Sequence, residues 1–436
     1  MHPELSFDQA PPISVPYRFF LTAPWFGVAA GLLLLIYGKS VLVTRWAPET
    51  LAVTHLITAG FMLQAMCGAL LQFIPVTVGG NVANPIRLAS FVHPIFIAGA
   101  LVLAGGFLSG ESVLLLAAPP LFVLGGTAFV IALFAALRRI TVANPTLTAL
   151  KLSLLALALT IVFGSVLSLS LGLSWSLQLL ELTAVHVGLG LAGWGLVLLL
   201  GVSLYVVPMF QLTPPYPVWF ARQMPRWVVA LVLVSLLSIV VPGNWLLTSV
   251  TLGFFAVAAA YAVMTIRLQM RRRRRLTDPS FWFFRGGMVA VLTAVALGGL
   301  RLSGVFIDLD APLLLSTGVL LLGAFMSVIS GMLYKVVPFI NWLHLQRLTQ
   351  ELAGFGSMPP NMRLMIPEAH AQRQMLMHFV ALLMILLAVW WPALVQLAGL
   401  MLMVSSAWLG INLLGGVRRY VVFSKQIRAD ASAQES

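Results

Sequence analysis

Apolar residues gather in twelve long segments, and short stretches rich in polar residues, proline or glycine separate them. The segments lie near 22–44, 50–76, 86–108, 112–137, 147–171, 179–209, 226–243, 245–266, 283–304, 311–338, 374–391 and 393–416. Each has about the 18 residues or more that a membrane-spanning helix needs. Backbone groups in lipid must satisfy their hydrogen bonds within their own segment, so the pattern predicts twelve transmembrane helices.

Composition makes the lipid bilayer the main partner of the chain. Of the 436 residues, 60% are hydrophobic and 8% are charged, whereas soluble domains carry about 25% charged residues. We therefore expect a polar tail over 1–20, one membrane domain over 21–424 and a second tail over 425–436. The first tail lacks the layout of a cleavable signal peptide. The only sizeable connection, a loop near 339–373, is predicted to lie on the cytoplasmic surface as a short amphipathic piece. A single cysteine, Cys67, excludes an intrachain disulfide and a cysteine metal cluster.

The net charge of +13 follows the membrane topology. Basic residues gather after even-numbered segments, as at Arg138–Arg139 and Arg271–Arg275, whereas odd connections hold little beyond Arg45 and Arg301. By the positive-inside rule, both termini are cytoplasmic, in a membrane that we take to be a bacterial inner membrane. The arginine run is interpreted as a topology anchor. A patch for anionic lipid is the alternative, and no nucleic-acid partner is expected.

One short pattern occurs three times, in the second, sixth and tenth segments. Each copy pairs a glycine with a proline seven residues later: Gly68 with Pro75, Gly201 with Pro208, and Gly331 with Pro338. The prolines are separated by 133 and then 130 residues. This period predicts three four-helix units, 21–140, 141–275 and 276–424. Glycine permits close helix approach and proline kinks a helix, although both are common in membrane helices anyway.

A polar or long side chain stands three residues before each of these prolines: Gln72, Tyr205 and Lys335. Because the copies fall at the predicted cytoplasmic ends of their helices, the three side chains could form a polar cluster that carries protons. Snorkelling to the interface is the alternative for Lys335.

Two histidines lie near the predicted outer ends of the second and sixth helices, at His55 and His186. An ionisable group at membrane depth needs a partner, and neutral imidazole commonly binds haem or metal. Gly190 and Gly193 share a helix face with His186, which suits the approach of a flat macrocycle. The histidines precede their prolines by 20 and 22 residues, an offset of about 200° on a regular helix.

Other candidates are weaker ligands. Met62 and Met66 share a predicted face with His55 and could pack against a porphyrin or bind its iron. His93 lies toward the cytoplasmic side and should not share the site. The alternative for His55 and His186 is a hydrogen bond to a neighbour such as Thr54, Thr183 or Glu181, and for His93 a bond to Ser90. His344, His370 and His378, in or beside the large loop, should be solvated.

These features together resemble subunit I of the haem–copper oxidases and the NnrS family of haem- and copper-containing membrane proteins. The residues that carry the resemblance are His55, His186 and the three Gly…Pro copies. The stretch Pro75-Val-Thr-Val-Gly79-Gly80 is similar to the Pro-x-x-x-Gly-Gly motif that ends the second helix of oxidases. The resemblance implies three pseudo-symmetric four-helix arcs, as in cytochrome c oxidase subunit I. It also implies haem at His55 and His186, and a role in electron transfer or in nitric-oxide or oxygen metabolism.

The chain departs from the oxidases at the ligands of their catalytic centre. Oxidases take haem ligands from the tenth helix and an adjacent pair of copper ligands from the seventh, and neither segment has a histidine here. Gly190 replaces the oxidase tyrosine. A three-histidine copper site is therefore not expected, and enzymatic activity stays open. A haem protein with a respiratory-chain or denitrification partner remains. The alternatives are a secondary transporter or permease, and a non-catalytic assembly or sensor subunit.

Overall fold

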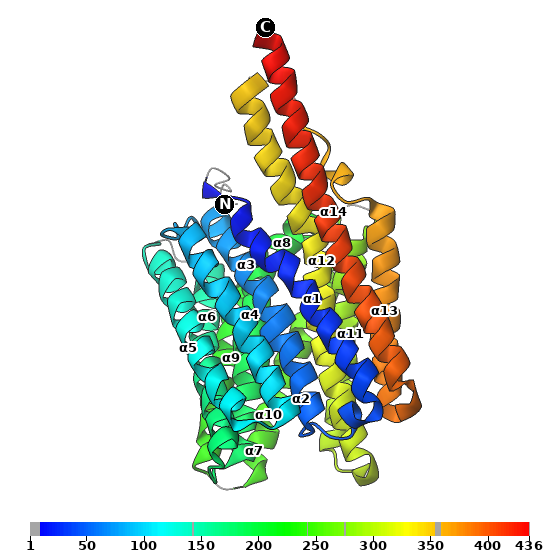
Figure 1. The fold of residues 1–436 in the computed structure, drawn as a ribbon. Helices are drawn as coiled ribbons and strands as arrows, with labels where there is room; N and C mark the ends of the chain where they lie inside the picture. The colour runs from blue at the N-terminus through cyan, green and yellow to red at the C-terminus, as the bar shows by residue number, and fades with distance from the viewer. Residues whose placement is uncertain (1–8, 142–143, 242, 274–275, 354–358, 436) are drawn as a thin grey trace.

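The computed structural model describes residues 9–141, 144–241, 243–273, 276–353 and 359–435. Within these ranges the chain forms helices and no strand. Twelve helical stretches there are long and apolar enough to cross a membrane, and they stand side by side in one bundle (Figure 1). The prediction of an all-α integral membrane protein with twelve spans is confirmed. Arg274, Arg275 and the first eight residues of the predicted N-terminal tail lie outside the described residues.

The spans consist of the following helices, in chain order: α1 (Ser14–Tyr37); α2 (Pro48–His55) continued by η3 (Leu56–Met62), α3 (Leu63–Phe73) and η4 (Ile74–Val78); α4 (Pro85–Ser109); α5 (Ser112–Arg138); α6 (Pro145–Leu173); α7 (Leu179–Val187) continued by η5 (Gly188–Leu196) and α8 (Val197–Gln211); α9 (Val218–Leu236); α10 (Asn244–Met270); α11 (Pro279–Leu302); α12 (Asp310–Ala353); α13 (Glu368–Trp390); and α14 (Val395–Glu435). Short 3-10 turns complete the connections: η2 (Gly38–Leu42), η6 (Leu237–Ile239), η7 (Ile307–Leu309), η8 (Met362–Leu364) and η9 (Pro392–Leu394).

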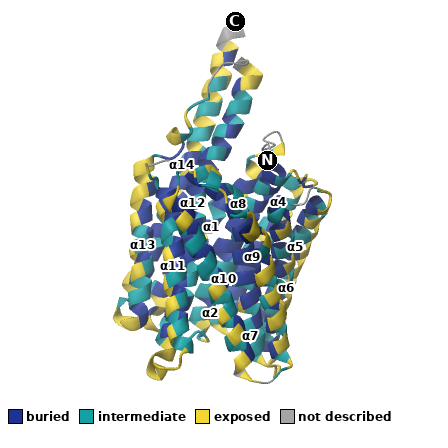
Figure 2. Cartoon of the chain, turned by 180° about the vertical axis from the view of Figure 1, so that it is seen from behind, coloured by how far each residue is buried: buried dark blue, intermediate teal, exposed yellow. Residues whose placement is uncertain are grey.

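Every fourth span lies at the centre of the bundle. The buried share is 83% in the second span and 61% in the sixth and tenth, against 28–50% in the others. The outer helices form a closed ring, because α1 packs on α14, α5 on α6, and α10 on α11. Exposed side chains accordingly lie on the outside of the bundle (Figure 2). The three spans that carry the Gly…Pro copies are therefore the three central ones.

The glycine of each copy admits the span that precedes it in the chain. A Cβ at Gly68 would lie 2.8 Å from the Cβ of Phe19 in α1, and one at Gly201 would lie 2.8 Å from the Cβ of Ala149 in α6. At Gly331 the same atom would lie 2.5 Å from the Cβ of Phe283 in α11. No side chain fits at these distances, so glycine is required by packing at all three positions.

Two helices continue well beyond their predicted ends. α12 runs to Ala353, so the predicted loop over 339–373 is wrong for its helical part. The predicted C-terminal tail over 425–436 is helical as far as Glu435, where α14 ends. The stretch Phe339–Leu352 contains neither proline nor glycine to end a helix. The ends of α12 and α14 project together from the bundle (Figure 1), and their mutual packing supports both. α1 likewise starts at Ser14, inside the predicted N-terminal tail.

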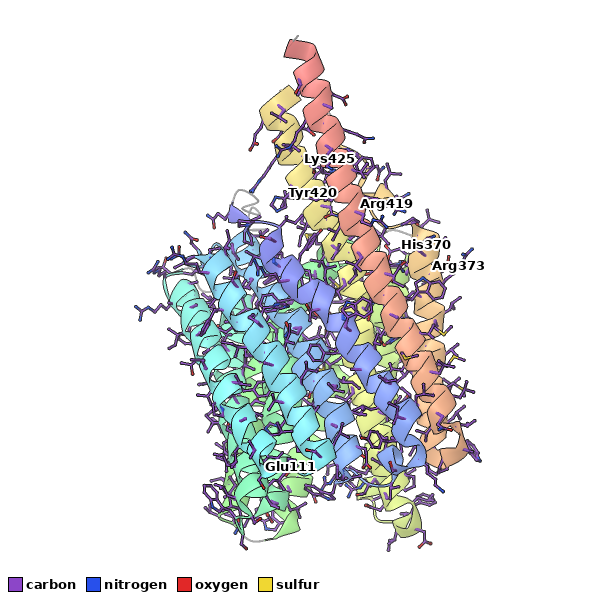
Figure 3. All side chains as sticks on the ribbon, viewed as in Figure 1. Glu111, His370, Arg373, Arg419, Tyr420 and Lys425 are labelled. Atoms are coloured by element: carbon purple, nitrogen blue, oxygen red, sulfur yellow. The ribbon has the colours of Figure 1, made fainter. Side chains whose placement is uncertain are left out.

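Charged residues mark the two ends of the bundle. The start of α1 and the end of α14 lie on one side, together with Arg373, Arg419 and Lys425, whereas Glu111 lies at the opposite end (Figure 3). Arg45 and Arg301 are the two arginines that lie in odd-numbered connections. The Nε atom of Arg301 is 2.9 Å from Oδ1 of Asp310. Burial and the charge of Arg301 lower the pKa of the Arg45 guanidinium, while Asp310 acts in the opposite direction.

Candidate functional site

The two histidines predicted as ligands meet between the second and sixth spans. His55 ends α2 and His186 lies in the last turn of α7. Their ring centroids are 6.3 Å apart, and the ring planes differ by only 18°. Both side chains are half-buried. Two side chains separated by 131 positions in the sequence thus form one paired site within the bundle.

A hydrogen bond to a backbone carbonyl fixes each ring. The Nδ1 atom of His55 lies 2.8 Å from the Leu51 carbonyl, and that of His186 lies 3.1 Å from the Thr160 carbonyl. A carbonyl can only accept, so in both neutral rings Nδ1 carries the proton and Nε2 presents a lone pair. The predicted alternative partners Thr54, Thr183 and Glu181 are not used.

His93 has the opposite arrangement, in which Nε2 carries the proton. Nε2 of His93 lies 2.8 Å from Oγ1 of Thr22, whose hydroxyl already donates to the Arg18 carbonyl. His93 therefore donates from Nε2, and it bonds to Thr22 rather than to the predicted Ser90. Its ring packs edge-to-face against Phe19, with ring centroids 5.1 Å apart, and it does not join His55 and His186. A histidine with a protonated Nε2 offers no ligand atom there.

The three histidines expected to be solvated differ from one another. His370 is exposed, as predicted, whereas His344 is half-buried on α12. His378 is only 5% exposed, so its prediction is wrong. Its Nε2 lies 2.8 Å from Oγ of Ser327, a hydroxyl that donates to the Gly323 carbonyl. His378 is therefore the donor to Ser327. The residue is buried because α13 packs on α12, whereas the sequence placed it only at the edge of a loop.

A π-helical segment follows each histidine of the pair. η3 begins directly after His55 and holds seven residues, and η5 begins two residues after His186 and holds nine. π-helical turns are rare and are frequent at functional sites. They also hold more residues per turn than an α-helix, so the predicted offset of about 200° does not apply. Sequence spacing alone misjudged which residues share a face with His55 and His186.

The predicted open glycine face is filled by α6. A Cβ at Gly193 would lie 2.9 Å from the Cβ of Ala156, and one at Gly190 would lie 3.4 Å from Cγ2 of Thr160. These glycines admit a neighbouring helix, so a macrocycle cannot lie on them. Gly164 of α6 is the glycine that serves the site, because a Cβ there would lie 2.8 Å from Cε1 of His186. On the other side, Phe107 lies 5.1 Å from the His55 ring, between centroids.

The two candidate methionines belong to the core. Met62 and Met66 are 2% and 7% exposed, respectively, and pack in the main hydrophobic cluster. Met66 lines a separate cavity farther along the second span. The π-helical segment removes the regular periodicity that placed both on the face of His55.

The three polar residues before the prolines do not form one cluster. The Tyr205 hydroxyl accepts a hydrogen bond of 2.7 Å from Nδ2 of Asn144. Lys335 is 2.6 Å from Oδ2 of Asp278. Gln72 has no partner for its buried Oε1 among the described residues. A shared proton path through Gln72, Tyr205 and Lys335 is therefore not formed by direct contacts.

Asn144 and Asp278 were missed as partners although the sequence signals them. Each is the N-cap of its helix and accepts from a backbone N–H there, at Thr146 in α6 and Phe281 in α11. Each also precedes a proline at the first helical position. Asn or Asp followed by proline is a recognised helix start, but which distant side chain it meets depends on the packing.

The donor set at the pair is small. Within the described ranges, no group of three or more His, Cys, Asp or Glu side chains could hold a metal ion. Two neutral imidazoles alone suit an acceptor that brings most of its own ligands. No protein-family model matches the chain, and no curated protein matches it either.

Proposed function

We propose that this integral membrane protein binds haem, whose iron His55 and His186 would hold, and that it serves electron transfer. The observation that carries the proposal is the pair of near-parallel rings, each held through Nδ1 and each presenting the lone pair of Nε2. Two lone pairs cannot bond to each other. Each is available to an electron-pair acceptor, and haem iron is a group that histidine holds in proteins.

The two imidazoles lie close enough to act together. Their ring centroids are 6.3 Å apart and their planes differ by 18°, so His55 and His186 would together hold a single haem bound at the pair.

The residues around the pair have defined roles in this proposal. The carbonyls of Leu51 and Thr160 hold the tautomer and raise the basicity of each imidazole. Gly164 leaves room for the His186 ring, and Phe107 covers His55. When bound, haem supplies one-electron redox chemistry, and the protein supplies its position and surroundings. Because the described part of the chain brings no third His, Cys, Asp or Glu to the pair, copper chemistry of the oxidase type has no support.

The wider setting follows from the spans and the charges. The three central helices and the glycine packing support an arrangement in three four-helix arcs, as the resemblance to oxidase subunit I and NnrS implies. The basic residues support both termini in the cytoplasm of a bacterial cell. A respiratory-chain or denitrification protein would then exchange electrons with the haem.

The test is the absorption spectrum of the purified protein after expression with added haem. The wild-type protein should show a Soret band, one iron per chain and a low-spin signal typical of two histidine ligands. His55→Ala and His186→Ala should each lose the low-spin signal and most of the bound haem. His93→Ala is the matched control, because His93 lies in the same bundle but donates from Nε2, and it should keep the spectrum.

Folding must be separated from ligation in these variants. His55→Gln and His186→Gln keep polar side chains of similar size, and monodisperse elution would show that the bundle is intact. A folded wild-type protein that takes up no haem would refute the proposal. So would a haem spectrum that survives loss of both histidines.

A further inference from the structure

A second site lies where the three central spans meet, far from the histidine pair. A cavity of about 160 Å³ separates the second, sixth and tenth spans beside the three Gly…Pro copies. Its wall is almost entirely apolar and is rich in aromatic rings. These aromatic residues come from α1 and from all three central spans: Phe20, Phe73, Tyr205, Phe210, Phe325 and Phe339.

One buried polar atom in this wall has no partner. Gln72 lines the cavity and is 7% exposed. Its Oε1 has no hydrogen-bond partner among the described residues. An unpaired buried acceptor is costly, and most such groups in proteins are paired. Oε1 itself is fully buried, so a rotation of the Gln72 amide toward the cavity that the residue lines would bring this acceptor to a donor on a ligand there.

Comparison of the three copies explains why Gln72 is left free. At the same position before the proline, Tyr205 bonds to the N-cap Asn144 and Lys335 pairs with the N-cap Asp278. The preceding helix of the first copy is α1, whose N-cap is Ile13. Isoleucine has no polar side-chain atom to offer. The first copy therefore lacks the partner that the other two have.

The size and lining of the cavity restrict what can fill it. An engineered apolar cavity of about 150 Å³ binds one benzene molecule, so this one accepts a single six-membered ring. The aromatic wall favours an aromatic ring over an acyl chain. Gln72 Oε1 requires a donor on that ring. The surrounding lipid favours a molecule that partitions into membranes.

We infer that the cavity binds the ring of a lipid-soluble phenol, the chemical class that includes membrane hydroquinones, and that the phenolic hydroxyl donates to Gln72 Oε1. The ring packs among Phe73, Tyr205 and Phe325, and the apolar tail leaves through the open side of the cavity. The inference does not rest on haem binding, because Gln72 follows His55 by 17 residues and so lies several helical turns farther along the second span.

The experiment measures ligand preference in lipid nanodiscs that contain the full chain. The probe is tritiated 4-decylphenol, and 1-decyl-4-fluorobenzene is a competitor of similar size without a donor. The wild-type protein should bind the phenol saturably and prefer it about 10-fold, the effect of one hydrogen bond to a buried acceptor. Gln72→Leu should reduce that preference to near unity, because it removes the acceptor and keeps the apolar wall.

Two further variants separate the cavity from general effects. Gln64→Leu makes the same change on the same helix at a buried residue that does not line the cavity, and it should keep the preference. Ala69→Phe places a ring in the cavity and should abolish saturable binding of both compounds. All variants are compared at equal lipid content, so that partitioning cancels in the ratios.

The outcomes decide between a specific site and unspecific occupancy. Absence of saturable phenol binding to the wild-type protein would overturn the inference. Equal affinity for the phenol and the fluorobenzene would overturn it as well, because water would then satisfy Gln72 and any apolar molecule would fill the space. Retention of the preference in Gln72→Leu would assign the donor contact to another residue and refute the role of Gln72.

Discussion

Alanine in place of Gly331 should destabilise the protein, against the ordinary helix propensity. In a regular helix, glycine to alanine stabilises by about 0.5–1 kcal/mol. At Gly331 the new Cβ would lie 2.5 Å from the Cβ of Phe283 and 3.2 Å from the Ser280 carbonyl oxygen. To reach a carbon–carbon distance of about 3.5 Å, α11 and α12 must separate locally by roughly 1 Å.

The size of this effect follows from the two opposing terms. Overpacking a close-packed interface costs about 1–3 kcal/mol. The gain in propensity offsets part of this cost, so Gly331→Ala should lose about 1–2 kcal/mol of unfolding free energy. Gly318 lies on the same helix, and a Cβ there would meet nothing within 4 Å. Gly318→Ala should therefore gain about 0.5–1 kcal/mol.

The two variants are compared by reversible unfolding in mixed micelles of a mild detergent and sodium dodecyl sulfate. The difference between them should be about 2 kcal/mol, with opposite signs relative to the wild type. If Gly331→Ala is as stable as Gly318→Ala, α11 and α12 do not approach as closely as described, and the packing role of the repeated glycines is refuted.

Two further changes test buried polar groups, with the same unfolding measurement. Asp278→Ala should lower the unfolding free energy by about 2–3 kcal/mol, because it removes an N-cap and leaves Lys335 partly buried without its partner. In the double variant with Lys335→Met this loss should be clearly smaller. Strictly additive effects of the two changes would argue against the ion pair. Gln64→Leu should stabilise by about 1 kcal/mol, because both amide atoms of Gln64 are buried without partners among the described residues; a loss of stability would mean that Gln64 is hydrogen-bonded.

The candidate site was only partly accessible to sequence reasoning. His55 and His186 could be selected because a histidine at membrane depth needs a partner. The Leu51 carbonyl is a local partner four residues before His55. The Thr160 carbonyl that bonds His186 could not be predicted, because it comes from a different span. The π-helical segments were also missed, and with them the faces of Met62 and Met66. Such segments are set by packing and leave no periodic signal in the sequence.

Hydrophobic patterning by itself determined the class of the protein and its twelve spans, because lipid forces each apolar segment to satisfy its own backbone. The spacing of glycine and proline in the sequence marked the three repeated Gly…Pro positions. Tertiary packing decided which residues meet. It placed α6 against Gly190 and Gly193, where an open face was expected, and extended α12 beyond the predicted loop. It also brought His55 and His186 together and left Gln72 without a partner. Contacts between distant segments depend on side-chain fit across helices, and spacing along one helix does not contain that information.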